Sequence, residues 1–361
     1  MNSVSNILNF RRFYTNGKIR SHIIADLIGE SAKIQGLGFK GVRLVPYAEA
    51  LGLNAISELA DIMWERPVGE FNEHEWLAAI EHTIESKWDP SKLNLILHSS
   101  GYDSRVISHF LCRSYKKKPG PILFVCIAPE VVGFEKIMRL QGWDESQMTT
   151  YDRYADPFNL MSDFGTAWEG WGSSSEIPTN VAVACIKYLQ MTDKLPENLN
   201  GVVLWTGMHV NELFVSMEAL APTMSSRYDH RMASAWGLAC PNIVAPVLSV
   251  RSLRAIFSKS GTKGYSNTKN QLRRKHLVEM LDPKLADIKR IKPPTGQNIH
   301  PSAANRMAKD FRASYYYKHI KQVPIPKLDH TTNPASNREF WKVWTFASLV
   351  EHLVKRGVKL S

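Results

Sequence analysis

A small-residue loop between an apolar segment and a helical pattern could bind a phosphate. Leu93–His98 has the length of a buried strand, Ser99-Ser100-Gly101 follows it, and Asp103-Ser104 opens a helical pattern. The first N–H groups of a helix have no partner within the helix, and the helix dipole is positive there. Small residues let an anion come close to these groups. The segment therefore predicts an anion site, and Asp103 predicts a Mg²⁺ ion between its carboxylate and the phosphate.

The loop resembles the S-G-G-x-D-S pyrophosphate loop of the ATP pyrophosphatase superfamily. Four positions match, namely Ser99, Gly101, Asp103 and Ser104, and Ser100 stands where the family has its first glycine. A serine can replace that glycine only if the position does not need a positive φ. The alternative interpretation is an ordinary strand-to-helix turn in which Asp103 or Ser104 caps the helix.

Later segments resemble parts of asparagine synthetases and follow one another in the same order. Gly201–Phe214 is similar to the family's V-V-L-S-G-D-G-G-D-E-L-F segment and keeps a glycine at Gly207. Ala245–Leu248 stands where the family has V-P-F-L, and Lys269–Arg273 and Lys289–Lys292 resemble its K-x-x-L-R helix and R-x-K turn. Because ordered segments are more specific together than alone, the chain is similar to the synthetase domain of the asparagine synthetase and β-lactam synthetase family.

The resemblance implies an ATP-dependent ligase that forms amides. Such enzymes adenylate a carboxylate with ATP and Mg²⁺, release AMP and pyrophosphate, and pass the acyl group to ammonia or an amine. By resemblance, Lys292 is the catalytic lysine that stabilises charge on the phosphates, and Arg273 is a supporting cation. The implied ATP ligands are Ser99, Ser100, Gly101, Tyr102, Asp103, Ser104 and Gly207, and the implied metal ligands are Asp103, Asn211 and Glu212.

The second loop departs from the family pattern. Asn211 stands where the family has a metal-binding aspartate, and a neutral amide oxygen is a weaker ligand for Mg²⁺ than a carboxylate. Met208 and His209 replace residues that are usually aspartate and glycine. The substrate pocket is therefore rebuilt or metal use is weaker, and a protein that only binds a nucleotide is the alternative to an active ligase.

Apolar segments of strand length alternate with helical patterns from Leu93 onward, which predicts an α/β fold. The predicted strands are Leu93–His98, Ile122–Ala128 and Val202–Trp205. The predicted helices are Asp103–Tyr115, Phe134–Leu140, Pro178–Met191, a helix that begins at Glu212, and Phe340–Lys355.

This alternation predicts a doubly wound parallel sheet, with the ligand bound beyond the carboxyl ends of the strands. The resemblance implies the adenine nucleotide alpha hydrolase-like version of that fold. Residues after Ser249 are expected to be mostly helical. We expect two units, a mixed N-terminal segment at residues 1–85 and the synthetase-like ATP pyrophosphatase domain at residues 86–361.

The net charge of +11 is concentrated in basic clusters. Arg113–Lys118, Lys269–His276 and Lys284–Lys292 are basic, and Arg312–Lys321 interleaves three tyrosines, Tyr315–Tyr317, with Arg and Lys. Such segments can bind a nucleic acid through its phosphates and its stacked bases. We favour solvated helix faces and a basic ATP channel, because the clusters overlap the synthetase-like segments, and nucleic acid is the alternative partner.

Other features bound the cellular setting. No apolar run approaches the roughly 20 residues that a membrane helix needs, and Met1–Arg20 lacks the apolar middle of a signal peptide. We therefore expect no membrane contact. The four cysteines are scattered without the spacing of a metal site, which predicts buried thiols in a reducing cytoplasm.

We do not expect the glutaminase domain of the glutamine-dependent relatives. Those enzymes begin with a cysteine after removal of Met, whereas this chain begins Met1-Asn2-Ser3. The nitrogen is then expected from free ammonia, from an amine on a substrate, or from a separate ammonia-supplying protein. Three functions compete: an amide-forming ligase acting on a small or medium carboxylate, an enzyme of the same superfamily that modifies a nucleic-acid base, and a nucleotide-binding protein without chemistry.

Overall fold

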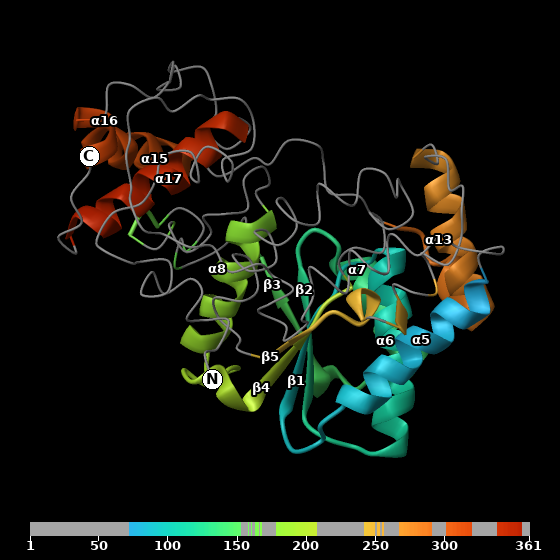
Figure 1. Ribbon diagram of the computed structural model, residues 1–361. Coiled ribbons are helices and arrows are strands. Elements are labelled where there is room, and N and C mark those ends of the chain that lie inside the picture. Colours follow the sequence, from blue (N-terminus) through green and yellow to red (C-terminus); the bar gives the residue numbers. More distant parts are fainter. Residues whose placement is uncertain are drawn as a thin grey trace.

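The computed structural model describes six main ranges of the chain, which Figure 1 draws as coloured ribbons. They are residues 72–152, 178–207, 242–249, 267–290, 301–319 and 338–355. Scattered positions between them are also described, namely 158, 160, 163–165, 167, 251, 252 and 255.

Five parallel strands form one sheet in the order β3-β2-β1-β4-β5. The strands are β1 (Leu93–Leu97), β2 (Ile122–Ile127), β3 (Met148–Tyr151), β4 (Val202–Trp205) and β5 (Asn242–Val244). At the centre, Leu95 of β1 is in register with Leu123 of β2 and Leu204 of β4. The central strands are nearly continuous apolar runs because helices cover a parallel sheet on its faces. The prediction of a parallel α/β sheet is confirmed.

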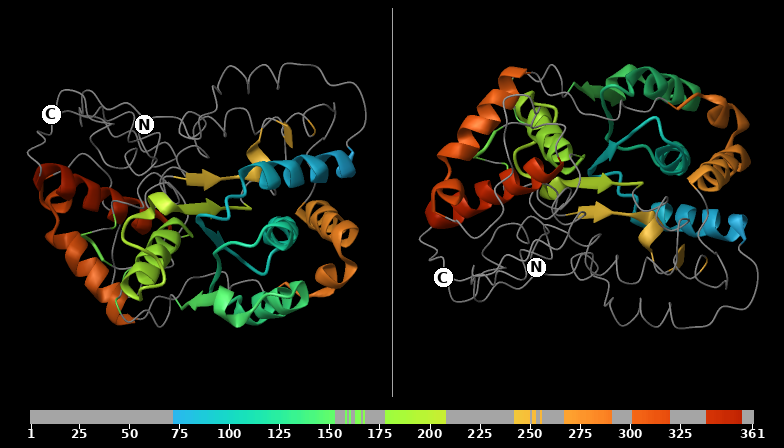
Figure 2. Two further views of the ribbon diagram at one scale, coloured as in Figure 1. Left: turned by 90° about the horizontal axis from the view of Figure 1, so that it is seen from below. Right: turned by 90° about the horizontal axis from the view of Figure 1, so that it is seen from above.

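Helices connect successive strands and cover both faces of the sheet. α6 (Tyr102–Lys117) connects β1 to β2, α7 (Val131–Gln141) connects β2 to β3, and α8 (Pro178–Met191) precedes β4. Figures 1 and 2 show α6 and α7 on one side of the sheet and α8 on the other. This arrangement follows from right-handed crossovers, because the chain moves outward from β1 to β3 and then returns to β4.

The described C-terminal part is helical, as the sequence predicts. α13 (Asn267–Leu281) packs against α6 and continues into α14 (Pro283–Asp287). α15 (Pro301–Ala313), α16 (Tyr315–His319) and α17 (Arg338–Lys355) pack together on the side of the sheet where α8 lies (Figures 1 and 2). None of the helices that the structure describes has both the length and the apolar character needed to cross a membrane.

α5 (Glu73–Lys87) belongs with the sheet. Its apolar face is buried in the common core through Trp76, Ile80 and Ile84, and Asn72 caps its first turn by accepting from the N–H groups of two residues of the helix. The boundary expected between residues 85 and 86 therefore falls inside one helix. Residues 1–71 lie outside the described ranges.

Several elements differ from the sequence-based expectation. Pro178–Met191 and Val202–Trp205 agree with it, whereas α6 and α7 extend beyond their predicted bounds. The short strands β3 and β5 were not expected, because a run of three or four residues carries little periodicity. The helix expected from Glu212 lies outside the described residues. Three cysteines are buried free thiols, as predicted, and they are Cys112, Cys126 and Cys185.

Candidate functional site

The two small-residue loops meet at the carboxyl edge of the sheet. One joins β1 to α6, and the other begins after β4, the neighbour of β1. A Cβ atom added to Gly207 would lie 3.1 Å from the carbonyl oxygen of Asp103 and 3.3 Å from Cγ1 of Ile107, so any larger residue would crowd this close approach. The strand order reverses between β1 and β4, and parallel α/β proteins bind ligands at such a point.

Serine hydroxyls hold the first loop in shape. The hydroxyl of Ser104 accepts from the N–H of Ser99 at 3.2 Å, and the two hydroxyl oxygens are 3.0 Å apart. The Ser99 hydroxyl in turn accepts from the N–H of Gly101 at 3.1 Å. Among the described non-glycine residues only Asp193 has a positive φ, so Ser100 does not need the glycine that stands there in the family motif. The loop is thus preformed.

The N-terminal turn of α6 begins directly after the loop. Gly101 precedes the helix in an extended conformation, with φ −72° and ψ 156°, and no side chain in the described residues caps the helix there. Gly101 occupies the N-cap position, so the cap considered for Asp103 or Ser104 is not found at that position. The first N–H groups of a helix have no carbonyl partner four residues earlier within the helix and lie at its positive end.

Asp103 is bound to an arginine of α13. Both carboxylate oxygens accept from Nη1 of Arg274 at 3.1 Å, and the two side chains are 25% and 8% exposed respectively. Burial raises the pKa of Asp103, and the Arg274 charge opposes that effect. The pairing neutralises a carboxylate that would otherwise repel a phosphate. A metal ion at Asp103 would share its carboxylate with Arg274 or replace that arginine.

Arg273, the residue before Arg274, forms its ion pair with α5 and not with α6. Arg273 forms an ion pair of 3.0 Å with Glu73 of α5, whereas Arg274 forms the pair with Asp103. Consecutive residues of an α-helix point about 100° apart, so the two arginines reach different neighbours. The arginine that the structure brings to the loop is thus Arg274, one position beyond the one expected from the K-x-x-L-R resemblance.

A fully buried arginine ties the loop to α14. The guanidinium of Arg105 donates two hydrogen bonds to the carbonyl oxygen of Ser100, at 3.1 and 2.7 Å, and one each to those of Leu285 (2.6 Å) and Ile288 (2.8 Å). Burial lowers the pKa of Arg105 to about 10, so the group is still charged at neutral pH. Arg105 is not among the site residues predicted from the sequence. Its only signal was a charged residue between Ser104 and the apolar Val106 on a buried helix face.

This connection brings Arg290 to the loop. A Cβ atom added to Gly101 would lie 3.9 Å from Nε of Arg290 and 2.9 Å from the Ser99 hydroxyl. Nε of Arg290 is buried and has no hydrogen-bond partner among the described residues. Arg290 is the first residue of the R-x-K resemblance, and Lys292, the third, lies outside the described residues. One cation of that segment is therefore at the loop.

A carboxylate from the next crossover also reaches the loop. Glu130, directly before α7, accepts from the backbone N–H of Ser100 at 2.6 Å and from its hydroxyl at 2.7 Å, both through Oε2. α7 itself packs tightly here, since a Cβ atom added to Gly133 would lie only 2.8 Å from Cβ of Ser100. Glu130 was also missed in the sequence, because its contact with the loop spans 30 residues.

The last strand-end residue before the loop is a buried neutral histidine. Nε2 of His98 lies 3.1 Å from the Ser108 hydroxyl, and the ring packs between Phe124 and Phe134. Burial lowers the pKa of His98 to about 3. His98 is therefore an uncharged, buried side chain that packs in the core directly before the loop.

Other predicted site residues are distributed as follows. Asn211 and Glu212 lie outside the described residues, and the described ranges contain no group of three or more His, Cys, Asp and Glu side chains that could hold a metal ion.

The three tyrosines at Tyr315–Tyr317 differ in exposure. Tyr316 is fully buried, the ring of Tyr315 contacts that of His319, and Tyr317 is 36% exposed. Tyr316 is therefore not accessible to a stacking base.

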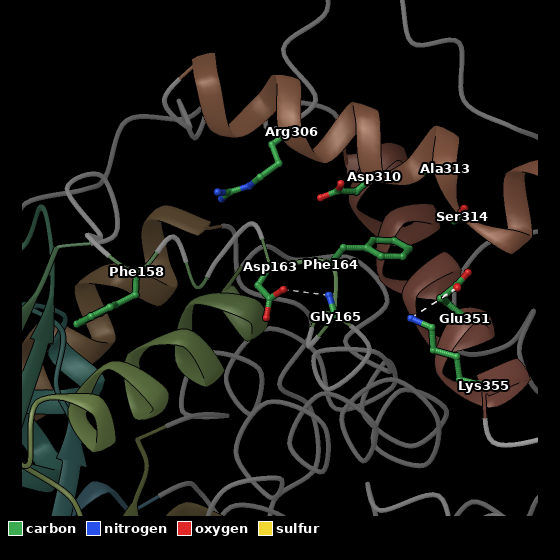
Figure 3. Close-up of a pocket in the computed structure, with 10 residues that line it drawn as sticks. All are labelled: Phe158, Asp163, Phe164, Gly165, Arg306, Asp310, Ala313, Ser314, Glu351 and Lys355. Carbon is green, nitrogen blue, oxygen red and sulfur yellow. Dashed lines mark hydrogen bonds and ion pairs between the residues drawn. The ribbon is translucent and has the colours of Figure 1, made fainter.

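A separate pocket of about 480 Å³ lies between α15, α17, Phe158 and residues 163–165 (Figure 3). Its charged side chains are of both signs, and Glu351 pairs with Lys355 at 3.7 Å while also accepting from the N–H of Tyr315. Burial raises the pKa of Asp310, and the positive charges of Arg306 and Lys309 offset part of that shift. No residue of the β1–α6 loop lines this pocket.

No protein-family model matches the chain, and no curated protein matches it. The resemblance to asparagine synthetases therefore depends on short segments. Three of them meet in the structure at the β1–α6 loop, through residues 99–104, Gly207 and Arg290.

Proposed function

We propose that this protein is an ATP-dependent ligase that adenylates a carboxylate, releases AMP and pyrophosphate, and passes the acyl group to ammonia or an amine. The observation that carries the proposal is the preformed loop at the end of β1, with the N-terminal turn of α6 behind its glycine N-cap and with Arg274 and Arg290 beside it. Both arginines come from the region that resembles the family's K-x-x-L-R and R-x-K segments. We propose that the sheet is the doubly wound, adenine nucleotide alpha hydrolase-like type.

Each group would have a defined task on pyrophosphate. The N–H groups at the start of α6 would bind phosphate oxygens, and the Ser99 and Ser104 hydroxyls would hold the loop in the binding shape. Arg290 would neutralise charge that develops on the leaving pyrophosphate, and Lys292 would join it from the same segment. Magnesium, carried in by the phosphates, would supply further charge neutralisation, with Asp103 as its carboxylate ligand in exchange for Arg274.

A small or medium carboxylate is the substrate class we favour over a nucleic acid. Stacking on three consecutive tyrosines was the main sequence argument for a polynucleotide, and Tyr316 is buried among Phe311 and its neighbours. The arginines at the loop are sufficiently explained by the phosphates of ATP. A separate ammonia-supplying protein is one source of nitrogen that this proposal allows.

The test is to incubate the protein with ATP, Mg²⁺ and a panel of carboxylates, with and without ammonia or amines, and to identify the nucleotide products. We expect AMP and pyrophosphate. Asp103→Ala should reduce turnover by about 10²-fold or more, the size of effect seen when one electrostatic contact to a reacting group is removed.

Glu73→Ala is the matched control, because it breaks the parallel ion pair that Arg273 makes on the same helix α13, at a similar distance and exposure. It should leave turnover unchanged. ADP and phosphate as products would contradict the proposal. ATP binding without any product would identify a nucleotide-binding protein without chemistry.

A further inference from the structure

The carboxylate of Glu130 already occupies part of the loop. One oxygen, Oε2, accepts from both the N–H and the hydroxyl of Ser100, at 2.6 and 2.7 Å. Hydrogen bonds to an ionised acceptor are short and strong, and these two have that length. The loop therefore holds an anionic oxygen of its own in this conformation, at donors that a phosphate would use.

The protein backbone keeps Glu130 beside the loop. Glu130 directly precedes α7, and Gly133 in the first turn of α7 touches Ser100 so closely that a Cβ atom would lie 2.8 Å from Cβ of Ser100. The carbonyl oxygen of Lys289 also lies near Gly133, 3.7 Å from the same built atom. Because the first turn of α7 packs closely against these two segments, the backbone of Glu130 stays beside the loop when its side chain turns away from Ser100.

A phosphate bound at the loop would therefore lie next to the carboxylate of Glu130. The phosphate and the carboxylate are both negatively charged and repel each other, and the repulsion is stronger where water is partly excluded. The buried charge of Arg105 attracts the Glu130 carboxylate and offsets part of this repulsion, but its guanidinium is held by hydrogen bonds to three backbone carbonyls and does not lie between the two anions as a bound cation would. A divalent cation on the phosphate oxygens changes the sign of the interaction, since it attracts both the phosphate and the carboxylate.

We infer that Glu130 is a specificity-determining residue, which disfavours metal-free polyphosphate at the loop and admits polyphosphate that carries a divalent cation. The inference depends on the proposed function, because it assumes that the loop binds pyrophosphate. It assigns the discrimination to a residue of the β2–α7 connection and not to the expected metal ligands at Asp103, Asn211 and Glu212.

Titration calorimetry with inorganic pyrophosphate, in excess Mg²⁺ or with a chelator, tests the inference. The wild-type protein should bind the magnesium complex at least about tenfold more tightly than metal-free pyrophosphate. Glu130→Gln keeps the size of the side chain and removes its charge. It should tighten binding of metal-free pyrophosphate by about tenfold and reduce the preference for the magnesium complex.

Glu135→Gln is the control, because Glu135 lies on the same helix but faces Arg139 at the surface. It should keep the wild-type preference. Equal wild-type affinity with and without Mg²⁺, or an unchanged preference in Glu130→Gln, would overturn the inference while leaving pyrophosphate binding intact. If neither protein binds pyrophosphate under either condition, the proposed function fails, and the inference fails with it. The wild-type comparison decides the matter even if Glu130→Gln does not fold.

Discussion

The loop edge, which we define as residues 98–105, Arg274 and residues 285–290, differs from the helical cluster of α15, α16 and α17 in the interactions that hold it together. At the loop edge a charged guanidinium is fully buried, and Nε of Arg274, Nε of Arg290 and Nδ1 of His98 are buried without a hydrogen-bond partner among the described residues. Such atoms cost folding free energy, and native structures contain few of them.

The helical cluster is held together mainly by aromatic packing. Phe311 contacts the rings of Phe340, Tyr316 and Tyr317, and Trp344 packs against Phe164. Glu351 forms local contacts with residues of α16 and α17 around the pocket. The pocket beside α15 and α17 is not the candidate site that we favour, because the start of α6, Arg274 and Arg290 come together at the loop edge and do not line the pocket.

Arg105→Met at the loop edge should have the largest effect, because it should lower both the stability of the protein and its binding of pyrophosphate. It leaves three buried carbonyl oxygens without their donor and releases α14 from the loop, so the free energy of unfolding should fall by about 3–5 kcal/mol, as when one partner of a buried charged network is removed. Chemical denaturation measures this change. Pyrophosphate binding should be lost as well, because Arg290 is then no longer held beside Gly101.

Tyr316→Ala is the matching change in the helical cluster. It removes a fully buried ring, and a comparable loss of about 3–5 kcal/mol is expected from the cavity. Pyrophosphate affinity, measured where the variant is folded, should stay at the wild-type value. If both variants weaken pyrophosphate binding equally, the loop edge is not a separate functional region.

Short-range features of the loop edge could be predicted from the sequence, and long-range ones could not. The strand, the loop and the start of α6 lie within a dozen residues, where apolar periodicity and small residues are informative. Arg105 contacts Leu285 and Arg274 contacts Asp103, with 180 and 171 residues between the partners. One sequence does not show which face of α13 meets the loop, so Arg273 was expected there and Arg274 was found.

The buried histidine predicts a dependence of stability on pH. The unfolded chain takes up a proton at His98 below pH 6.5, whereas the folded protein does so only near its lowered pKa of about 3. Stability from this group therefore falls as the pH drops from 6.5 toward 3, by about 2 kcal/mol between pH 7 and pH 5. Wild type should lose that much more than His98→Gln, which has no proton to gain, in denaturation at the two pH values. Parallel losses would mean that His98 is not buried as a neutral group.

The smallest expected effect concerns the fit between α7 and the loop. A methyl group at Gly133 must move Ser100, whose Cβ lies 2.8 Å from the new atom, and overpacking of this kind costs about 1–3 kcal/mol. An alanine stabilises a helix interior by about 0.5–1 kcal/mol relative to glycine, so the net loss for Gly133→Ala should be about 1 kcal/mol. Pyrophosphate affinity should fall by about tenfold, because Ser100 carries a donor of the site.

Gly201→Ala is the control for that substitution. A Cβ atom at Gly201 has no neighbour within 4 Å, and Gly201 does not have a positive φ, so neither stability nor pyrophosphate affinity should change. Calorimetric titration and denaturation of the two variants side by side provide the comparison. A Gly133→Ala protein with wild-type affinity would show that the position of Ser100 is not important for binding, and the loop edge would then have to bind its anion through the N–H groups of α6 alone.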